Sequence, residues 1–532
     1  MRQTRPKRMT VAVVIAVLLA WAALASTAQA QTLTYAMAGG WDTLDPNRTT
    51  FFRVGRTMIH VVEPMLWQTG PGVFEPGLAT SWEVNDDATE YRLTLREGVT
   101  FHDGTPFNAE AVRFTYDRIV DPETRSQTAR TIIGPYLETE ILGEHEVIVR
   151  FSRPFAPFLN SLSYPYLGIV SPTAYAATVQ DEWGESVLVG TGPFKLEAYE
   201  PGSRVELVRN DDYAWAPEHF GRSGPAAFER LVFELVTEAT PRVGSLLTGE
   251  AQFIEDVPTL DVPAIDTDAD FVVAQVPHSG AGRALMFNFQ RAPTDELAVR
   301  RAIQLASDKE TMLLTVFDGF GETSCGPLTP VVPFFDSATC DMYTFDPEAA
   351  RAVLDEAGWV AGGDGVRERD GDRLVIRHYY QANDPTSIQM AQVMQADLAD
   401  VGIEVELNGL AGAGFLDAVR RGDHNTQNWF QSGTDPDILR NNFHSSNAGG
   451  GPNRNNYIDD EMDALLDAAS AAADPDARAE LYAQIQRKIM DEAVMLFYVD
   501  PVVLFAHSAD LADPYFYLSS IFPYFYPASL GN

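Results

Sequence analysis

The stretch SIQMAQVMQADLADVGIEVEL, residues 387–407, decides the fold class of this chain. Residues 387–401 show a helical pattern of apolar side chains, and Gly402 then supplies a residue that commonly ends helices. The residues that follow, IEVEL, alternate apolar and polar side chains as a half-buried strand does. A helix, a glycine stop and a strand are the unit of an open α/β sheet. The sequence therefore predicts an α/β protein.

The same two patterns recur along the chain. Its 532 residues are too many for one hydrophobic core and enough for two or three domains. Strand-like alternation occurs at residues 146–151, 204–208 and 374–377, and helical patterns occur at 297–317, 347–357 and 476–492.

Two apolar segments have the character of crossings between lobes. Residues 284–290 (ALMFNFQ) precede a polar break, and residues 495–506 (MLFYVDPVVLFA) are interrupted by Asp500 and Pro501. A chain that leaves one lobe, builds another of ordinary domain size and returns has two crossings. We expect the two crossings to form a hinge between the lobes.

The N-terminus has the pattern of a secretory signal peptide. Four basic residues precede the apolar run of residues 11–25, and Ala28-Gln29-Ala30 forms a small-x-small cleavage site before Gln31. The alternative, a membrane anchor, needs about 20 apolar residues. The cleavage point has no cysteine for a lipid anchor. We expect a soluble mature protein outside the cytoplasm.

The net charge limits the possible binding partners, and the two cysteines suggest a disulfide. The formal net charge of −37 falls to −41 when the four basic residues of the signal peptide are removed. Such a chain repels phosphate backbones and anionic lipids, so no nucleic-acid partner is expected. Cys325 and Cys340 are the two cysteines, and export favours one disulfide between them over two separately buried thiols.

The segment YRLTLREGVTFHDGTPFNAEAVRFTYDRI, residues 91–119, places a His-Asp pair between a strand and a helix. His102, Asp103 and Gly104 have turn character, and Asn108 is suited to cap the helix that follows. A metal role for this pair has no third ligand at suitable spacing.

Four stretches together resemble the family 5 extracellular solute-binding proteins of ABC importers, the group with dipeptide-, oligopeptide- and nickel-binding members. They are residues 91–119, VGTGPFKLEAYEPGSRVELVRNDDYAW from 189, MFNFQRAPTDELAVRRAIQLASDKE from 286 and YTFDPEAARAVLDEAGW from 343. The resemblance implies an α/β, two-lobed periplasmic binding protein fold of type II. It implies an accessory α/β domain in the first lobe, in which His102 and Asp103 form a structural corner.

The resemblance also implies a division of the chain. We expect residues 1–30 to be the signal peptide and residues 71–199 the accessory domain. Residues 31–70, 200–285 and 500–532 are expected to form lobe I, and residues 286–499 lobe II.

Two departures from peptide-binding relatives concern the expected cleft. The segment NWFQSGTDPDILRNNFHS from Asn428 resembles their Trp-x-x-Asp-x-x-Asp-Pro, with Trp429 and Asp435 in register. Ser432 stands where the first Asp would take the ammonium group of the ligand. In dipeptide-binding relatives an Arg four residues before the helix-side Pro pairs with the ligand carboxylate, and counting back from Pro385 gives Gln381.

Losing both charge anchors argues against a free dipeptide and predicts a neutral cleft for a sugar, a modified or longer peptide, or another polar organic solute. Core packing is the alternative for each aromatic residue in the expected site, and a turn is the alternative for Asp435. The candidate ligand-binding residues are Trp41, Asp42, Asn288, Tyr379, Tyr380, Gln381, Trp429, Ser432 and Asp435.

The sequence thus predicts a monomeric solute-binding component that delivers its ligand to ABC permease subunits in the inner membrane, with no cofactor and no catalysis. A nickel-chelate carrier, with His378 and His424 as the nearest candidates, and an oligosaccharide carrier are alternatives in the same family. A chemoreceptor is a further candidate partner. A secreted hydrolase is the alternative from another class, although GxSxG, HExxH and Walker A motifs are absent from the sequence.

Overall fold

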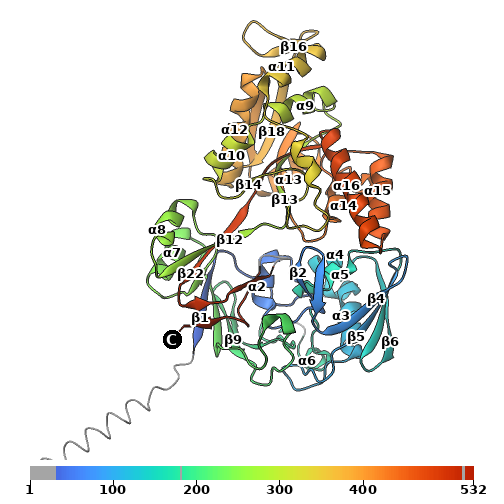
Figure 1. Ribbon diagram of the computed structural model, residues 1–532, viewed down its shortest axis with the longest axis vertical. Coiled ribbons are helices and arrows are strands. Elements are labelled where there is room, and N and C mark those ends of the chain that lie inside the picture. The colour runs from blue at the N-terminus through green and yellow to red at the C-terminus, as the bar shows by residue number, and fades with distance from the viewer. Residues whose placement is uncertain (1–30, 180–181, 518–521, 532) are drawn as a thin grey trace, which may run out of the picture.

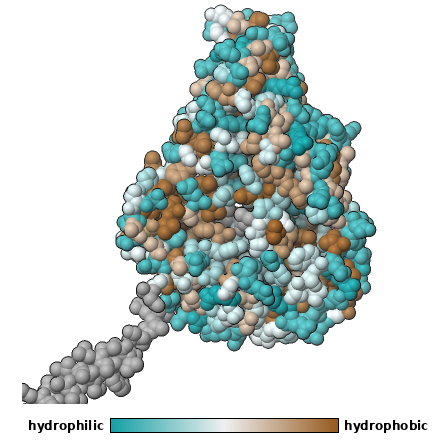
Figure 2. Space-filling model, viewed as in Figure 1, coloured by the Kyte–Doolittle hydropathy of each residue, from teal (hydrophilic) through white to brown (hydrophobic). Residues whose placement is uncertain are grey.

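Two bodies joined by extended strands make up the protein in the computed structural model, which describes residues 31–179, 182–517 and 522–531 (Figure 1). The expected signal peptide, residues 1–30, lies outside the described residues. Within the described ranges no helix is both long and apolar enough to cross a membrane. In Figure 2 hydrophilic residues, in teal, are spread over both bodies, with hydrophobic residues, in brown, among them.

Lobe I, the lower body in Figure 1, is built on a seven-stranded mixed sheet. The first strand, β1, pairs in parallel with β10 and β11, and β22 returns from the far end of the chain to pair with β11 and β12. In spatial order the strands are β12 (Phe271–Pro277), β22 (Val502–Ser508), β11 (Phe253–Ile254), β1 (Thr32–Met37), β10 (Arg230–Leu235), β9 (Arg204–Arg209) and β8 (Phe194–Glu200).

A separate four-stranded antiparallel sheet lies beside lobe I, within the range expected for the accessory domain. Its order is β4 (Ala79–Val84), β5 (Glu90–Leu95), β7 (Glu146–Phe151) and β6 (Tyr136–Gly143), with α3 (Ala109–Val120) packed on it. One buried cluster contains Trp67, Tyr91 and Phe233, so this sheet shares a hydrophobic core with lobe I. The domain boundaries stay a prediction, and the one at residue 199 falls inside β8.

The His102-Asp103 corner is held by local hydrogen bonds. Asp103 accepts hydrogen bonds from the backbone and hydroxyl of Thr105 and from the Ser171 hydroxyl, and His102 Nε2 lies 3.0 Å from the carbonyl oxygen of Gly192. Asn108 caps α3 by accepting from the backbone N–H of Ala111. These contacts fit the structural role expected for the corner.

Lobe II, the upper body in Figure 1, contains a six-stranded sheet. Asp384 accepts from the backbone N–H of Thr386, and Pro385 takes the first helical position, so the helix expected at 387–401 begins two residues earlier. The strands in order are β14 (Glu322–Thr323), β21 (Met495–Asp500), β13 (Gly280–Phe287), β20 (Thr426–Ser432), β18 (Val375–Gln381) and β19 (Glu404–Leu410).

The helices of lobe II follow the expected patterns with one break. The pattern at 297–317 is two helices, α9 (Leu297–Ala306) and α10 (Lys309–Val316), because Asp308 caps a new helix through the backbone N–H of Thr311. The remaining longer helices are α11 (Pro347–Glu356), α12 (Pro385–Asp400), α13 (Gly412–Arg420), α15 (Asp460–Ala471) and α16 (Pro475–Asp491).

In the residues that the structure describes, the chain crosses between the lobes twice. One crossing is at Asp500-Pro501, where β21 of lobe II continues into β22 of lobe I, as the sequence predicted. The other is at residues 277–279, between β12 and β13, so the crossing expected at 284–290 was wrong: most of that run lies in β13 of lobe II. The backbone N–H of His278 donates to the carbonyl of Pro501 at 3.0 Å, which joins the two crossings.

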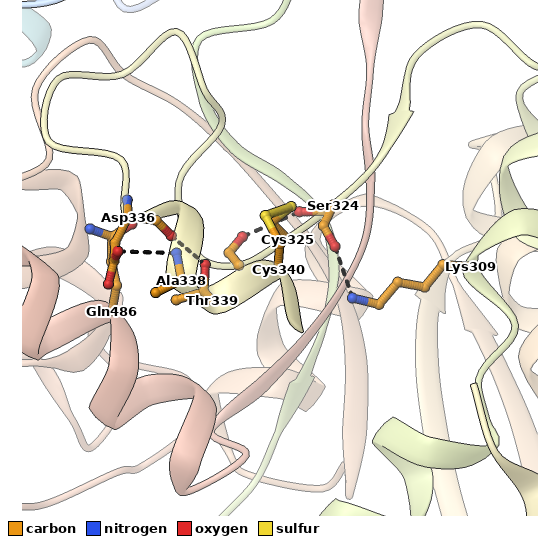
Figure 3. Close-up of a disulfide and its surroundings, with 9 residues drawn as sticks. Lys309, Ser324, Cys325, Asp336, Ala338, Thr339, Cys340 and Gln486 are labelled. Carbon is orange, nitrogen blue, oxygen red and sulfur yellow. Dashed lines mark hydrogen bonds between the residues drawn. A yellow bond between two sulfur atoms is a disulfide. The ribbon is translucent and has the colours of Figure 1, made fainter. Parts of the chain in front are cut away.

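Cys325 and Cys340 form the expected disulfide in lobe II (Figure 3). Lys309 Nζ donates to the carbonyl oxygen of the neighbouring Ser324 at 2.8 Å. Cys340 lies in a short 3-10 helix, η6 (Ser337–Asp341), whose first turn is capped by the side chain of Asp336. The bridge thus ties this helix to the segment beside β14.

Gly190 lies where two backbone segments of lobe I touch. A Cβ at this position would lie 2.1 Å from the carbonyl oxygen of Val61. We expect Gly190→Ala to lower the free energy of unfolding by about 1–3 kcal/mol, because the backbone must shift to admit the methyl group. Urea denaturation measures the change.

Gly244→Ala is the matched control. Gly244 lies in α7 (Ala239–Leu247), where a Cβ would meet nothing within 4 Å. Alanine there is expected to raise stability by about 0.5–1 kcal/mol, since glycine in a helix has more freedom to lose on folding. Equal effects of the two substitutions would contradict the close approach at Gly190.

Candidate ligand-binding site

A cavity of about 470 Å³ lies between the lobes, beside both crossings. Strands from each lobe end here, so loops and strand ends of both sheets supply its wall. Lobe I contributes Phe52, Arg53, Arg56, Asp256, Val257, Val502, Val503 and Leu504, the crossings contribute His278, Ser279 and Pro501, and lobe II contributes Arg283, Phe430, Ser432 and Gly433.

A second cavity of about 400 Å³ extends the first toward the accessory sheet. The two share Phe52, Ser432 and Gly433, so they are adjoining parts of one cleft. The wall of the second cavity is completed by the segment after β20 and by residues between α4 (Thr128–Ile133) and Tyr164.

The lobes touch through a few hydrogen bonds at the edge of this cleft. Thr434 of lobe II accepts from Asn160 Nδ2 at 2.8 Å, and its hydroxyl lies 2.5 Å from the Tyr164 hydroxyl. The backbone N–H of Ala156 donates to the carbonyl of Ser470 at 2.8 Å. The two lobes are therefore in contact across the cleft, an arrangement that we call closed.

The charges on the lobe I wall are paired with one another. Glu255, fully buried after β11, accepts hydrogen bonds from Arg53 and Arg56 and from the Tyr35 hydroxyl. Burial opposes ionisation, but the charges of the two arginines hold the pKa of Glu255 below its ordinary value. Arg53 also pairs with Asp256 at 2.8 Å. Two cations and two anions thus balance on this wall.

The lobe II wall has a different character. Arg283 lies with its guanidinium carbon 4.1 Å from the ring centroid of Phe430, and the ring of His278 lies 4.3 Å from the same centroid. His278 Nε2 lies 2.9 Å from the hydroxyl oxygen of Ser432. Burial, and then the nearby charge of Arg283, lower the pKa of His278 to about 3, so this imidazole is neutral.

Two of the residues predicted for the site line the cleft. Ser432, at the end of β20, belongs to both cavities. Asp435 lines the second cavity, but both its carboxylate oxygens accept from Arg478, at 2.7 and 3.0 Å. Asp435 could therefore bind a ligand only while it also pairs with Arg478.

Three predicted residues lie outside the lining of these two cavities. The indole N–H of Trp41 donates to the Thr57 hydroxyl, and its ring packs in the lobe I core. Asp42 accepts from Thr49 and Thr50 within its own loop. Asn288 is buried at the end of β13 remote from the crossings, where Nδ2 donates to the carbonyl of His424.

The remaining four predicted residues belong to β18 and β20. Tyr380 stacks on His378 with ring centroids 5.9 Å apart, and Trp429 packs on a hydrophobic cluster of lobe II. Tyr379 and Gln381 lie at the same end of β18, and Gln381 is exposed. None of the four lines the two cavities. Their contacts with ligand stay a prediction.

Four features of the cleft were not predicted from the sequence: Arg283, His278, Phe430 and the Arg53–Arg56 pair. One signal was available: Arg283 interrupts HSGAGRALMF, a run of small and apolar residues in which a charge is out of place. The stretch chosen as the crossing began at Ala284, one residue later.

The histidines named for the nickel alternative lie within lobe II. His378 Nδ1 lies 3.0 Å from the Thr426 hydroxyl, and the ring of His424 lies 6.5 Å from that of Tyr379. Among residues 31–179, 182–517 and 522–531, no three His, Cys, Asp or Glu side chains gather in a way that would hold a metal ion.

The sequence is similar to those of known binding proteins over most of its length. The dipeptide-binding protein of Escherichia coli strain K12 is 28% identical in an alignment of 514 positions that covers 91% of this chain and 91% of the relative. Heme-binding protein A of Haemophilus influenzae is 29% identical in an alignment of 469 positions that covers 84% of this chain and 81% of the relative. Both relatives are named as binding proteins.

A solved structure agrees in fold. NikA from Brucella suis, in complex with Fe(III)-EDTA, superimposes with a TM-score of 0.81 and 25% identity, over 94% of this chain and 99% of that one. The fold is thus the type II periplasmic binding protein fold predicted from the sequence. The sequence pattern of bacterial extracellular solute-binding proteins, family 5 (middle region), matches residues 73–451. This chain therefore belongs to the family 5 bacterial extracellular solute-binding proteins.

Proposed function

We propose that the protein is the solute-binding component of an ABC importer and captures a peptide or another polar organic solute between its lobes. The observation that carries this proposal is the cavity of about 470 Å³ that residues of both lobes line beside the two crossings. A ligand there contacts both halves at once, so it stabilises the closed arrangement over the open one.

The crossings are suited to serve as the hinge. Within the described part of the chain, residues 277–279 and Asp500-Pro501 connect the two sheets, and the backbone hydrogen bond from His278 to Pro501 joins these crossings. A few residues between rigid elements absorb the backbone rotation of domain closure in such proteins. The polar contacts around Thr434 then close the opposite edge of the cleft.

Family membership leaves the ligand open, because the relatives named above bind different molecules. A dipeptide, heme and Fe(III)-EDTA appear in the names and title of three of them. We propose that a free dipeptide is a poor ligand here. Ser432 offers a hydroxyl, already beside His278, where an ammonium group would need a carboxylate, and Gln381 is a neutral amide.

The proposal extends to location and partners. Export by the signal peptide of residues 1–30 would place the protein in the periplasm, where it would act as a monomer and meet the permease subunits of the importer. Support comes from the basic and apolar N-terminal pattern and from family membership.

Native mass spectrometry of freshly purified protein tests the proposed function. We expect a mass equal to the chain plus one small organic molecule, which is released unchanged on unfolding. Chemical conversion of the released molecule when it is returned to fresh protein would contradict a binding role and favour the hydrolase alternative. Nickel in the released material would favour the metal-chelate alternative.

Free dipeptides are expected to raise the melting temperature of the ligand-free protein little at micromolar concentration. The reason is the loss of both charge anchors at Ser432 and Gln381, and stabilisation by mass action requires affinity. Differential scanning fluorimetry with dipeptides of varied side chains measures the effect. A shift of many degrees would contradict the argument from these two positions.

A further inference from the structure

Arg283 extends from β13 into the cavity between the lobes. The register between β13 and β20 shifts between Ala281 and Ala284, and that between β13 and β21 shifts between Arg283 and Ala284. Such a bulge changes the direction in which a strand side chain points. Here it brings a charged side chain to the cavity from a strand whose neighbouring residues are small or apolar.

The guanidinium of Arg283 has no partner among the described residues. Its Nε is buried without a hydrogen bond, and no carboxylate of the described chain lies within ion-pair distance of it. The nearest acidic influence is Asp384, whose oxygens accept from Thr386 and Ser387 at the start of α12. Arg283 rests on the face of Phe430 alone.

The other charges of the cleft are already satisfied. Arg53 and Arg56 are balanced by Glu255 and Asp256. His278 is neutral, because burial and the charge of Arg283 lower its pKa. Arg283 is therefore the uncompensated charge of the first cavity, and an uncompensated buried charge is costly unless an anion joins it.

Among the described residues that line the cleft, no carboxylate is free to pair with a cationic ligand. Asp256 pairs with Arg53, and Asp435 pairs with Arg478. Asp437, in the second cavity, accepts from the Tyr482 hydroxyl, and burial raises its pKa to about 7, so its negative charge is weakened at neutral pH. These residues therefore provide no carboxylate that could pair with the ammonium group of a ligand.

The surroundings of Arg283 fit a carboxylate on an apolar body. The planar guanidinium matches a carboxylate in a two-point hydrogen-bonded pair. His278 and Ser432 supply further polar atoms beside it, while Phe52, Val257, Val502 and Leu504 add apolar surface to the lobe I wall beside its paired charges.

We infer that the cleft binds its solute through one carboxylate held by Arg283, and that this solute has a blocked or absent amino group and an apolar body. The inference rests on the proposed function and narrows its ligand class. N-acylated amino acids and N-blocked short peptides have this chemistry, whereas free dipeptides and sugars do not.

The test uses N-acetylleucine, N-acetylphenylalanine and N-acetyl-Leu-Phe, each with its C-terminal amide and its free-amine parent, in titration calorimetry with the unfolded-and-refolded, ligand-free protein. At least one acid is expected to bind, with an affinity about tenfold or more above that of its amide and its free-amine parent, the size of a lost charge-assisted hydrogen bond. Failure of every acid to bind, or equal affinity of acids and amides, would overturn the inference.

Arg283→Gln is the decisive variant, and Arg377→Gln is its control. Arg377 is an exposed β18 arginine paired with Glu406, outside the cleft. Arg283→Gln is expected to abolish the preference for acid over amide while the ligand-free melting temperature does not fall, because the substitution removes an unpaired charge. Arg377→Gln is expected to keep the preference. A preference that persists in Arg283→Gln would overturn the inference.

The same variant separates this inference from the proposed function. If Arg283→Gln still copurifies with the solute that native mass spectrometry finds in the wild type, the inference fails and the binding role stands. If the wild-type solute is converted chemically, the binding role itself fails.

Discussion

Glu255→Leu is expected to lower the free energy of unfolding by about 3–5 kcal/mol, the cost of removing one partner from a buried ion pair. The Glu255 side chain is 0% exposed and that of Arg56 is 5% exposed. Leucine would leave the Arg56 guanidinium buried with no bonded carboxylate, and the Tyr35 hydroxyl and the Ala38 N–H would also lose their acceptor. One substitution would thus strand three buried donors, and Arg53 would keep Asp256 as its remaining partner.

Urea unfolding at neutral pH, followed by circular dichroism, measures this loss. Glu250→Leu is the control, because it makes the same chemical change at an exposed position five residues earlier. Its effect should stay within about 0.5 kcal/mol. A loss below 1 kcal/mol for Glu255→Leu would mean that water or a rearranged neighbour satisfies Arg56, and the account of the lobe I wall would be wrong.

Removing the Cys325–Cys340 bridge is expected to cost about 3 kcal/mol. The cysteines are 15 residues apart, and closing a loop of that length restricts the unfolded chain by this amount in the chain-entropy model. The double variant Cys325→Ser/Cys340→Ser should therefore unfold at lower urea concentration than the wild type.

A reductant provides the matched control for the disulfide. Dithiothreitol should destabilise the wild type by a similar amount and leave the double variant unchanged, since only the wild type has a bridge to lose. A wild-type curve that is insensitive to complete reduction would contradict a stabilising role for the bridge.

The fold was largely predictable because its signals are local. The helix, Gly402 and the strand after it appear as predicted, since side-chain periodicity and helix-ending residues act within a few positions. The crossing at Asp500-Pro501 was found for the same reason. The break between α9 and α10 at Asp308 was not predicted. The Asp308 side chain caps α10 by accepting from a backbone N–H, and the spacing of apolar residues gives no sign of such a cap.

The candidate site was less predictable because it forms from segments that are remote in sequence. Ser432 was placed at the cleft by its motif, and the structure puts it there beside His278, a residue 154 positions away. A neutral cleft was expected, yet Arg283 lines it without a counter-charge. Whether an arginine is paired depends on which carboxylates reach it in three dimensions, and the sequence does not contain that information directly.

The positions of the aromatic residues relative to the cleft were also hard to predict from the sequence. Trp41 follows the first strand, in a loop expected to line the cleft, but its indole packs in the lobe I core and bonds to Thr57. Phe430, between two residues of the motif that was examined, is the ring that contacts both Arg283 and His278. Side chains alternate between the two faces of β20, so Phe430 faces the cleft and its neighbour Trp429 does not. Which face of the strand borders the cleft depends on how β20 pairs with other strands, and the sequence of β20 alone does not show this.

Small-angle X-ray scattering tests the central claim, closure of two lobes over a solute, most directly. The protein would be stripped of ligand by unfolding and refolding, then measured alone and with the solute recovered from it. The account predicts a smaller radius of gyration with the solute present, and a solution profile that then matches the closed structure. An identical radius with and without bound solute, with occupancy verified by native mass spectrometry, would contradict it.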